Sequence, residues 1–205
     1  MPMENFFKIR AEKQAHIVNA AFMVFGKQGY RKASLSDIAK EAGITKGMIT
    51  YYFGSKKMLY MYLMEICQAQ IIDRIQEKIS KGGTDFFEGL RTITDIYVKA
   101  VKEHPSLVSF INSSYYETDP EVADIIEKQD EWECSQTSYF LESVDESQFK
   151  PESSPKLICK LLFWSLEGFM MELFETDHAT NNRIDEIASQ FYQCLDIMQA
   201  KFYKE

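Results

Sequence analysis

Residues 46–51 combine side chains that are suited to contacting a polyanion. If this segment is helical, its exposed positions are Lys46, Gly47, Met48, Thr50 and Tyr51. They supply a cation, a point where a backbone can be approached closely, an apolar tip and two hydroxyl groups. Lysine can donate to guanine, and Met or the Thr methyl group can touch the methyl group of thymine. The segment therefore favours contact with the phosphates and base edges of DNA.

Two short helices joined at a glycine are expected to position this segment. Ser34 and Asp37 form a start resembling a capping box, and Gly43 ends the first helix. Thr45 can cap the second helix, which ends near Phe53. This spacing predicts a helix-turn-helix, whose second helix lies in the major groove of DNA. An ordinary corner between two helices is the alternative, and the polar surface of the second helix disfavours it. The packed seam is expected to contain Ile38, Ala39, Ala42, Ile44 and Ile49.

Longer helices are expected on both sides of this pair. Apolar residues recur with helical spacing in Lys8–Gln28, and Gly29 is a natural stop. Ser55 can cap a second long helix running from Lys56 to about Ser80, where two glycines follow. The expected N-terminal module thus has three helices, and the long helix leads out of it.

The charge of the chain is divided unequally between its two parts. Residues 1–60 contain ten Lys or Arg and four Asp or Glu, whereas residues 61–205 contain thirteen and twenty-seven. The first part is therefore at +6 and the second at −14, within a total of −8. A chance distribution of solvated charge is one explanation, and a polyanion-binding module on an acidic body is the other. Together with the helix pair, the asymmetry favours DNA binding.

The sequence lacks the patterns of the common enzyme classes. His16, His104 and His178 are isolated from one another and show no metal-ligand spacing. No motif for a serine nucleophile or a phosphate-binding loop is present. The sequence therefore predicts a protein that is not an enzyme and that uses no cofactor and no metal.

Residues 17–59 resemble the N-terminal domain of the tetracycline-repressor (TetR) family of bacterial regulators. The matching patterns are I-x-x-A-A-x-x-x-F-x-x-x-G from residue 17, S-x-x-D-I-A-x-x-A-G-I-T-K-G-x-I from residue 34, and Y-Y-F-x-S-K-x-x-L from residue 51. The chain departs from the family at Thr50, where members often carry an aromatic residue. Beyond this block the resemblance is architectural.

The resemblance implies a role for individual residues. Ser34, Tyr51 and Lys56 would contact phosphates, and Ser34 would do so near the first turn of its helix. Tyr52 would do the same, or it would be a core aromatic. Base contacts would fall to the outward residues of the second helix, Lys46, Gly47, Met48 and Thr50.

Two C-terminal helices are predicted to form a dimer interface. Pro155–Glu175 is apolar over a wide arc, and Arg183–Tyr203 carries a narrower apolar stripe. Two copies of each would make a four-helix interface, and two half-sites of DNA require such a dyad. The alternative is that both are core helices of a monomer. The predicted interface residues are Leu161, Gly168, Phe169, Ile187, Phe191, Leu195 and Met198.

An effector pocket is expected in the C-terminal part, where aromatic residues and methionines are frequent. Most such side chains form plain core, so the individual assignments leave that alternative open. Glu117 and Glu172 also lie near or within this apolar region, and a carboxylate there would favour a cationic effector if it were not simply solvated. The predicted lining is Phe110, Tyr115, Trp132, Tyr139, Trp164, Glu167 and Met171.

These expectations combine into an all-α protein with a DNA-binding domain at residues 1–55 and an effector-binding and dimerisation domain at residues 56–205. Its partners would be a palindromic double-stranded DNA operator, a second copy and a small lipophilic effector that releases a repressor. A helix-turn-helix protein that answers to a protein partner, or is architectural, is the alternative. No signal peptide, membrane span or paired cysteine motif is evident, which predicts a cytoplasmic protein.

Overall fold

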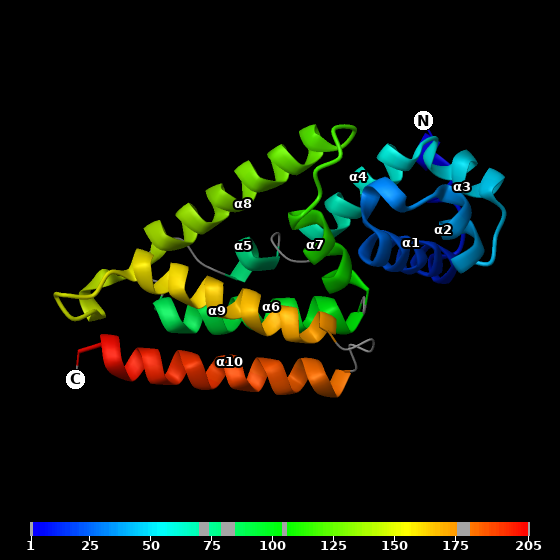
Figure 1. The fold of residues 1–205 in the computed structure, drawn as a ribbon. Helices are drawn as coiled ribbons and strands as arrows, with labels where there is room; N and C mark the ends of the chain where they lie inside the picture. Colours follow the sequence, from blue (N-terminus) through cyan, green and yellow to red (C-terminus); the bar gives the residue numbers. More distant parts are fainter. Residues whose placement is uncertain (1, 70–73, 79–84, 104–105, 176–180, 205) are drawn as a thin grey trace. The chain divides into compact units, whose positions relative to one another are not determined.

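The structure, a computed structural model, describes residues 2–69, 74–78, 85–103, 106–175 and 181–204. This part of the chain is helical, which confirms the predicted all-α fold, and none of its helices is long and apolar enough to cross a membrane. In chain order (Figure 1), the elements are η1 Pro2–Glu4, α1 Ala11–Lys32, α2 Leu35–Glu41, α3 Lys46–Phe53, α4 Lys56–Gln68, α5 Arg74–Lys78, α6 Phe86–Glu103, α7 Leu107–Tyr115, α8 Ala123–Ser143, η3 Glu146–Gln148, α9 Pro155–Glu175 and α10 Asn181–Phe202.

The helices form two compact units. Unit 1 comprises Met1–Gln70 and His104–Trp132, and unit 2 comprises Ile71–Glu103 and Glu133–Glu205. Each unit therefore combines segments that are distant in the sequence. The predicted division at residue 55 concerns function rather than packing, and it remains a prediction.

The core of unit 1 is aromatic and joins α1 to α7. The ring of Tyr60 lies 5.1 Å from the ring of Phe25 and 5.1 Å from the ring of Phe110, measured between centroids. At Gly26 of α1, an added Cβ would lie 2.6 Å from Oγ of Ser109 and 2.9 Å from its backbone carbon. Because real Cβ atoms do not approach backbone so closely, the contact between α1 and α7 requires a glycine at this position.

Most predicted helix boundaries in unit 1 are close to the observed ones. Gly29 interrupts α1 as predicted, since it leaves helical geometry with φ 68° and ψ 170°, and one further turn follows it. Of the helix predicted from Lys56 to about Ser80, the structure describes two pieces, α4 Lys56–Gln68 and α5 Arg74–Lys78, and residues 70–73 between them lie outside the described part. The predicted stop at residues 81–83 lies outside the described residues.

Unit 2 is built around α6, α9 and α10. Its fully buried cluster is Phe86, Phe87, Phe140, Phe149, Ile158, Leu162, Phe191 and Leu195. Both predicted C-terminal helices are confirmed. The first spans Pro155–Glu175 as predicted, and the second spans Asn181–Phe202 instead of Arg183–Tyr203.

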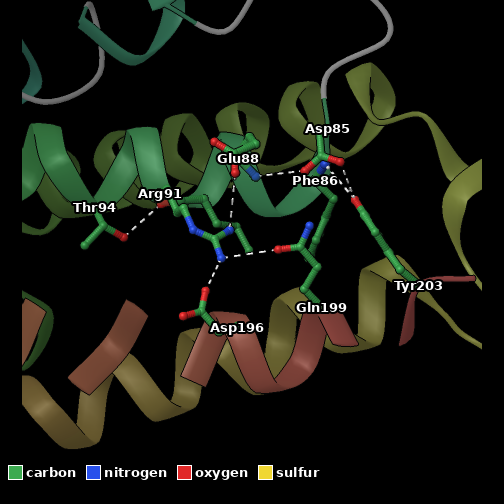
Figure 2. Close-up of polar contacts among 9 residues, drawn as sticks. Asp85, Phe86, Glu88, Arg91, Thr94, Asp196, Gln199 and Tyr203 are labelled. Atoms are coloured by element: carbon green, nitrogen blue, oxygen red, sulfur yellow. Dashed lines mark hydrogen bonds and ion pairs between the residues drawn. The ribbon is translucent and has the colours of Figure 1, made fainter. Parts of the chain in front are cut away.

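Polar contacts join α6 to the C-terminal end of α10 (Figure 2). Arg91 pairs with Asp196 and donates to Gln199 Oε1 at 3.2 Å. Tyr203 Oη accepts the N–H of Phe86 at 3.2 Å and donates to Asp85 Oδ2 at 3.1 Å. Burial, followed by the Asp85 charge, raises the pKa of Tyr203 above its usual value, so the phenol stays a neutral donor.

Candidate nucleic-acid interface

The helices α2 and α3 begin at the residues that the sequence predicts. Oγ of Ser34 accepts the N–H of Asp37 at 3.1 Å, and its hydroxyl donates to Asp37 Oδ2 at 2.6 Å. Oγ1 of Thr45 accepts the N–H of Met48 at 3.3 Å. Side-chain caps of this kind satisfy N–H groups that have no partner within the helix, which fixes where each helix starts.

The turn between α2 and α3 depends on a glycine. Gly43 has φ 60°, a conformation that L side chains rarely adopt, and Ile44 N donates to Ala39 O at 2.9 Å across the turn. Of the predicted seam, Ile44 is half-buried and the others are buried: Ile38, Ala39, Ala42 and Ile49. The predicted helix-turn-helix packing is therefore confirmed.

One face of α3 carries exposed residues that the fold does not use. Lys46, Gly47 and Thr50 are exposed, Met48 is half-buried, and Tyr51 is 61% exposed. A Cβ added at Gly47 would meet only Thr45 Oγ1, at 3.9 Å. Since packing within the chain does not require a glycine there, the open backbone at Gly47 is available to an approaching partner.

Tyr52 occupies the opposite side of α3 from this face. It is 5% exposed and its ring lies 5.9 Å from the ring of Phe6, edge to face. Phe6 itself is fully buried against Phe53 at 4.7 Å. Of the two alternatives for Tyr52, its position is that of a core aromatic. Its phosphate contact stays a prediction.

Two hydroxyl groups of the predicted interface already donate within the chain. Thr50 Oγ1 donates to Lys46 O at 3.1 Å, and the Ser34 hydroxyl donates to Asp37. A hydroxyl has one proton, so in this arrangement each can only accept a further hydrogen bond. Contact with a phosphate oxygen, which is an acceptor, would require these protons to turn away from their present partners.

Lys56, at the first position of α4, is held by residues 29–34, which we call the α1–α2 connection and which comprise the end of α1 from Gly29 and the two residues that follow it. Its Nζ donates to Tyr30 O at 2.9 Å and to Ala33 O at 3.2 Å, and lies 4.1 Å from the centroid of the Tyr30 ring. An ammonium group has three donors, so one is left for a phosphate. Burial raises the pKa of Tyr30 above its usual value, so the ring under the ammonium stays neutral.

The residues predicted for the dimer interface divide into two groups. Ile187, Phe191 and Leu195 are buried in unit 2, where Phe191 and Leu195 belong to its core cluster, and Met198 is half-buried against it. On α9, by contrast, Leu161 is 39% exposed and Gly168 is open to solvent. The side chain of Phe169 lies outside the described ones. The interface role of all seven residues remains a prediction.

The residues predicted for the effector pocket belong to both units. In unit 1, Phe110 is fully buried and Tyr115 is 47% exposed. In unit 2, Tyr139 is half-buried and Trp164 is 54% exposed. The side chains of Trp132, Glu167 and Met171 are not among those described. The pocket therefore stays a prediction.

Sequence reasoning missed two residues that support the interface. Phe6 anchors the N-terminal segment on α3, and a Phe-Phe pair in a polar stretch is the signal that marks it. Glu117 accepts the N–H of Tyr30 at 2.7 Å, although it was considered only for an effector site. No local pattern could have found this contact, because 87 residues separate its partners.

The fold and this face of α3 define a helix-turn-helix protein. Residues 17–63 match the family described as bacterial regulatory proteins, tetR family. The match covers the helix-turn-helix part of the chain.

Known relatives share either part of the sequence or the whole fold. The fatty acid metabolism regulator protein of Bacillus subtilis is 34% identical over 77 residues, which are 38% of this chain and 40% of that protein. A TetR family regulator from Chloroflexus aurantiacus superposes with a TM-score of 0.72 at 20% identity and full coverage of both chains. FadR of Bacillus subtilis in complex with stearoyl-CoA superposes with a TM-score of 0.63 at 18% identity, covering 88% of this chain and 96% of that one.

Proposed function

We propose that the protein is a transcriptional regulator that binds a palindromic operator through α3 and acts as a repressor. The observation that carries this proposal is the exposed face of α3, where Lys46, Gly47 and Tyr51 are exposed and the space beside Gly47 is open. A helix of this kind enters the major groove with its N-terminal residues at the base edges. Lys46 and Gly47, in the first turn of α3, are those residues.

The proposed operator-binding form is a homodimer. Leu157, Leu161 and Trp164 on α9 are 55%, 39% and 54% exposed, and Gly168 lies one turn further along the same face. An apolar helix face of this size is costly in water and favours burial against a partner. Since a palindrome offers two identical half-sites, a second copy is the partner that fits.

The proposed effector is a small lipophilic molecule, and the relatives suggest which one to test first. The regulator of Bacillus subtilis is named for fatty acid metabolism, and FadR was solved with stearoyl-CoA. We therefore choose stearoyl-CoA as the first probe. Residues 1–55 are proposed as the DNA-binding domain and residues 56–205 as the effector and dimer domain of a cytoplasmic protein.

The proposal is tested by footprinting the full chain on the DNA upstream of its own gene. Protection of a palindrome, lost when stearoyl-CoA is added, is the expected result. A ligand that binds only the folded state must also raise the melting temperature. Protection that persists with stearoyl-CoA and with a panel of other lipophiles would favour control by a protein partner. Failure to protect any upstream sequence would contradict the proposed function.

A further inference from the structure

The connection between α1 and α2 leads directly into the helix-turn-helix and is held from two sides. At its start, Gly29 leaves helical geometry, and the N–H of Tyr30 donates to Glu117 Oε2 at 2.7 Å. From the other side, Nζ of Lys56 donates to Tyr30 O at 2.9 Å and to Ala33 O at 3.2 Å. A carboxylate and an ammonium group therefore hold the N–H and the C=O of the same residue.

The carboxylate of Glu117 is itself fixed by its surroundings. Its Oε1 accepts the N–H groups of Thr118 and Asp119, both at 2.9 Å. The preceding helix α7 is seated on α1 through the close approach of Ser109 to Gly26. Ser113 Oγ also donates to Phe25 O at 3.2 Å. Glu117 N also donates to Ser114 O of α7 at 3.2 Å, so the position of Glu117 Oε2 is set by the end of α7 and the turn that follows it.

A small movement of this carboxylate has a direct consequence for the DNA-binding face. Hydrogen bonds between N–H and oxygen weaken steeply once the two atoms separate beyond about 3.2 Å. Loss of the Glu117 contact removes one restraint on the backbone of Tyr30, whose carbonyl group holds Lys56, while the ring stays packed against Tyr60. The same connection ends at Ser34, which caps α2. Ser34, where the helix-turn-helix begins, and Lys56, in the helix that follows it, are thus both linked to this connection.

We propose that Glu117 is a positioning residue for DNA binding. It holds the α1–α2 connection, and through it Ser34 and Lys56, in the geometry that the operator requires. This inference rests on the proposed DNA-binding function. Glu117 lies outside the helix-turn-helix and regulates its binding to DNA. Because Glu117 directly follows α7, displacement of α7 would change the geometry of the DNA-binding face through the hydrogen bond from Tyr30 N–H to Glu117.

The test compares operator affinity and salt dependence for variants of the full chain. Glu117→Ala is expected to weaken operator binding about tenfold, a common size for coupling between sites. The salt slope should fall less than in Lys56→Ala, because the ammonium group that contacts a phosphate is displaced but still present. Glu117→Gln keeps a neutral acceptor and should lose less. Lys56→Ala should weaken binding and also lower the slope by about one.

A double-mutant cycle then shows whether the two residues act through the same connection. If both hold Tyr30, the combined Lys56→Ala and Glu117→Ala variant should lose less affinity than the product of the single losses. Hydrogen exchange at residues 30–33 should rise in both Glu117 variants, which can be measured without DNA. Glu127→Gln removes an equal charge from an exposed position nearby and should behave as the wild type.

A variant of lower stability serves as a control, because it tests whether weaker DNA binding follows from loss of stability alone. Ile17→Val, in the core of unit 1, lowers the melting temperature without touching this connection, and below that temperature it should bind the operator normally. Wild-type affinity in Glu117→Ala, or single losses that simply multiply in the double variant, would overturn the inference while leaving the proposed function intact. Absence of operator binding by the wild type would instead overturn the proposed function.

Discussion

Helices α3 and α9 both expose residues that their own units do not need, but the residues differ in kind. On α3 these are a cation, an open glycine and hydroxyl-bearing side chains: Lys46, Gly47, Thr50 and Tyr51. On α9 they are large and apolar: Leu157, Leu161, Phe163 and Trp164. The exposed residues therefore distinguish what each helix meets.

The difference shows which kind of partner each face is adapted to. Polar and cationic groups exchange contacts with water for contacts with phosphates and base edges, and this exchange depends strongly on salt. Apolar groups gain only by leaving water, roughly in proportion to the area buried. Salt should therefore weaken what α3 binds and affect what α9 binds much less.

The largest expected effect comes from placing charge on the α9 face. Leu157→Glu combined with Leu161→Glu should produce monomers and weaken operator binding more than 100-fold, because a single half-site binds poorly. Both side chains are exposed within the chain, so the melting temperature of the monomer should change little. Sedimentation and operator titration measure the two effects.

The control for this variant is Lys99→Glu on α6, an exposed position where the net charge changes by the same amount. It should remain dimeric and bind the operator. Dimers of normal affinity in the doubly charged variant would show that α9 does not face a second copy.

Gly168→Leu separates two roles for the same face. A Cβ added at Gly168 meets nothing within 4 Å, so the single chain should fold with a leucine there. If a second copy packs on this face, the larger side chain prevents close approach, and sedimentation should show monomers that bind the operator poorly. Normal dimers that bind DNA but no longer respond to stearoyl-CoA would place Gly168 at the effector site instead.

Lys46→Ala should have an intermediate effect on the α3 face. Loss of a base contact costs about 1–3 kcal/mol and relaxes the preference at one base pair. Titration of the operator and of single-base variants measures both. An equal loss on scrambled DNA would instead make Lys46 a phosphate contact.

The smallest effect is expected at Gly47. Because space is open there, Gly47→Ala should stabilise the fold by up to about 1 kcal/mol, as alanine favours helix over glycine. The added methyl group should nevertheless reduce operator affinity if DNA approaches this backbone closely. Chemical denaturation and operator titration are the measurements. A gain in stability with unchanged affinity would mean that no close approach occurs.

Features that are determined by residues close together in the sequence could be predicted, whereas features that depend on distant residues could not. The starts of α2, α3 and α4 were predicted because Ser34, Thr45 and Ser55 each cap a backbone group three residues away. Contacts such as that of Tyr52 with Phe6 depend on packing between distant segments, and no periodicity encodes them.

Trp164 makes the proposed association visible by spectroscopy. The chain has two tryptophans, and this one is 54% exposed on α9 with Nζ of Lys160 lying 5.0 Å from the centroid of its ring. An indole in water emits at longer wavelength than one shielded from water. In a chain whose other tryptophan, Trp132, is replaced by phenylalanine, dilution would therefore shift the emission as α9 becomes exposed, and the monomer–dimer equilibrium could be followed without labels or DNA.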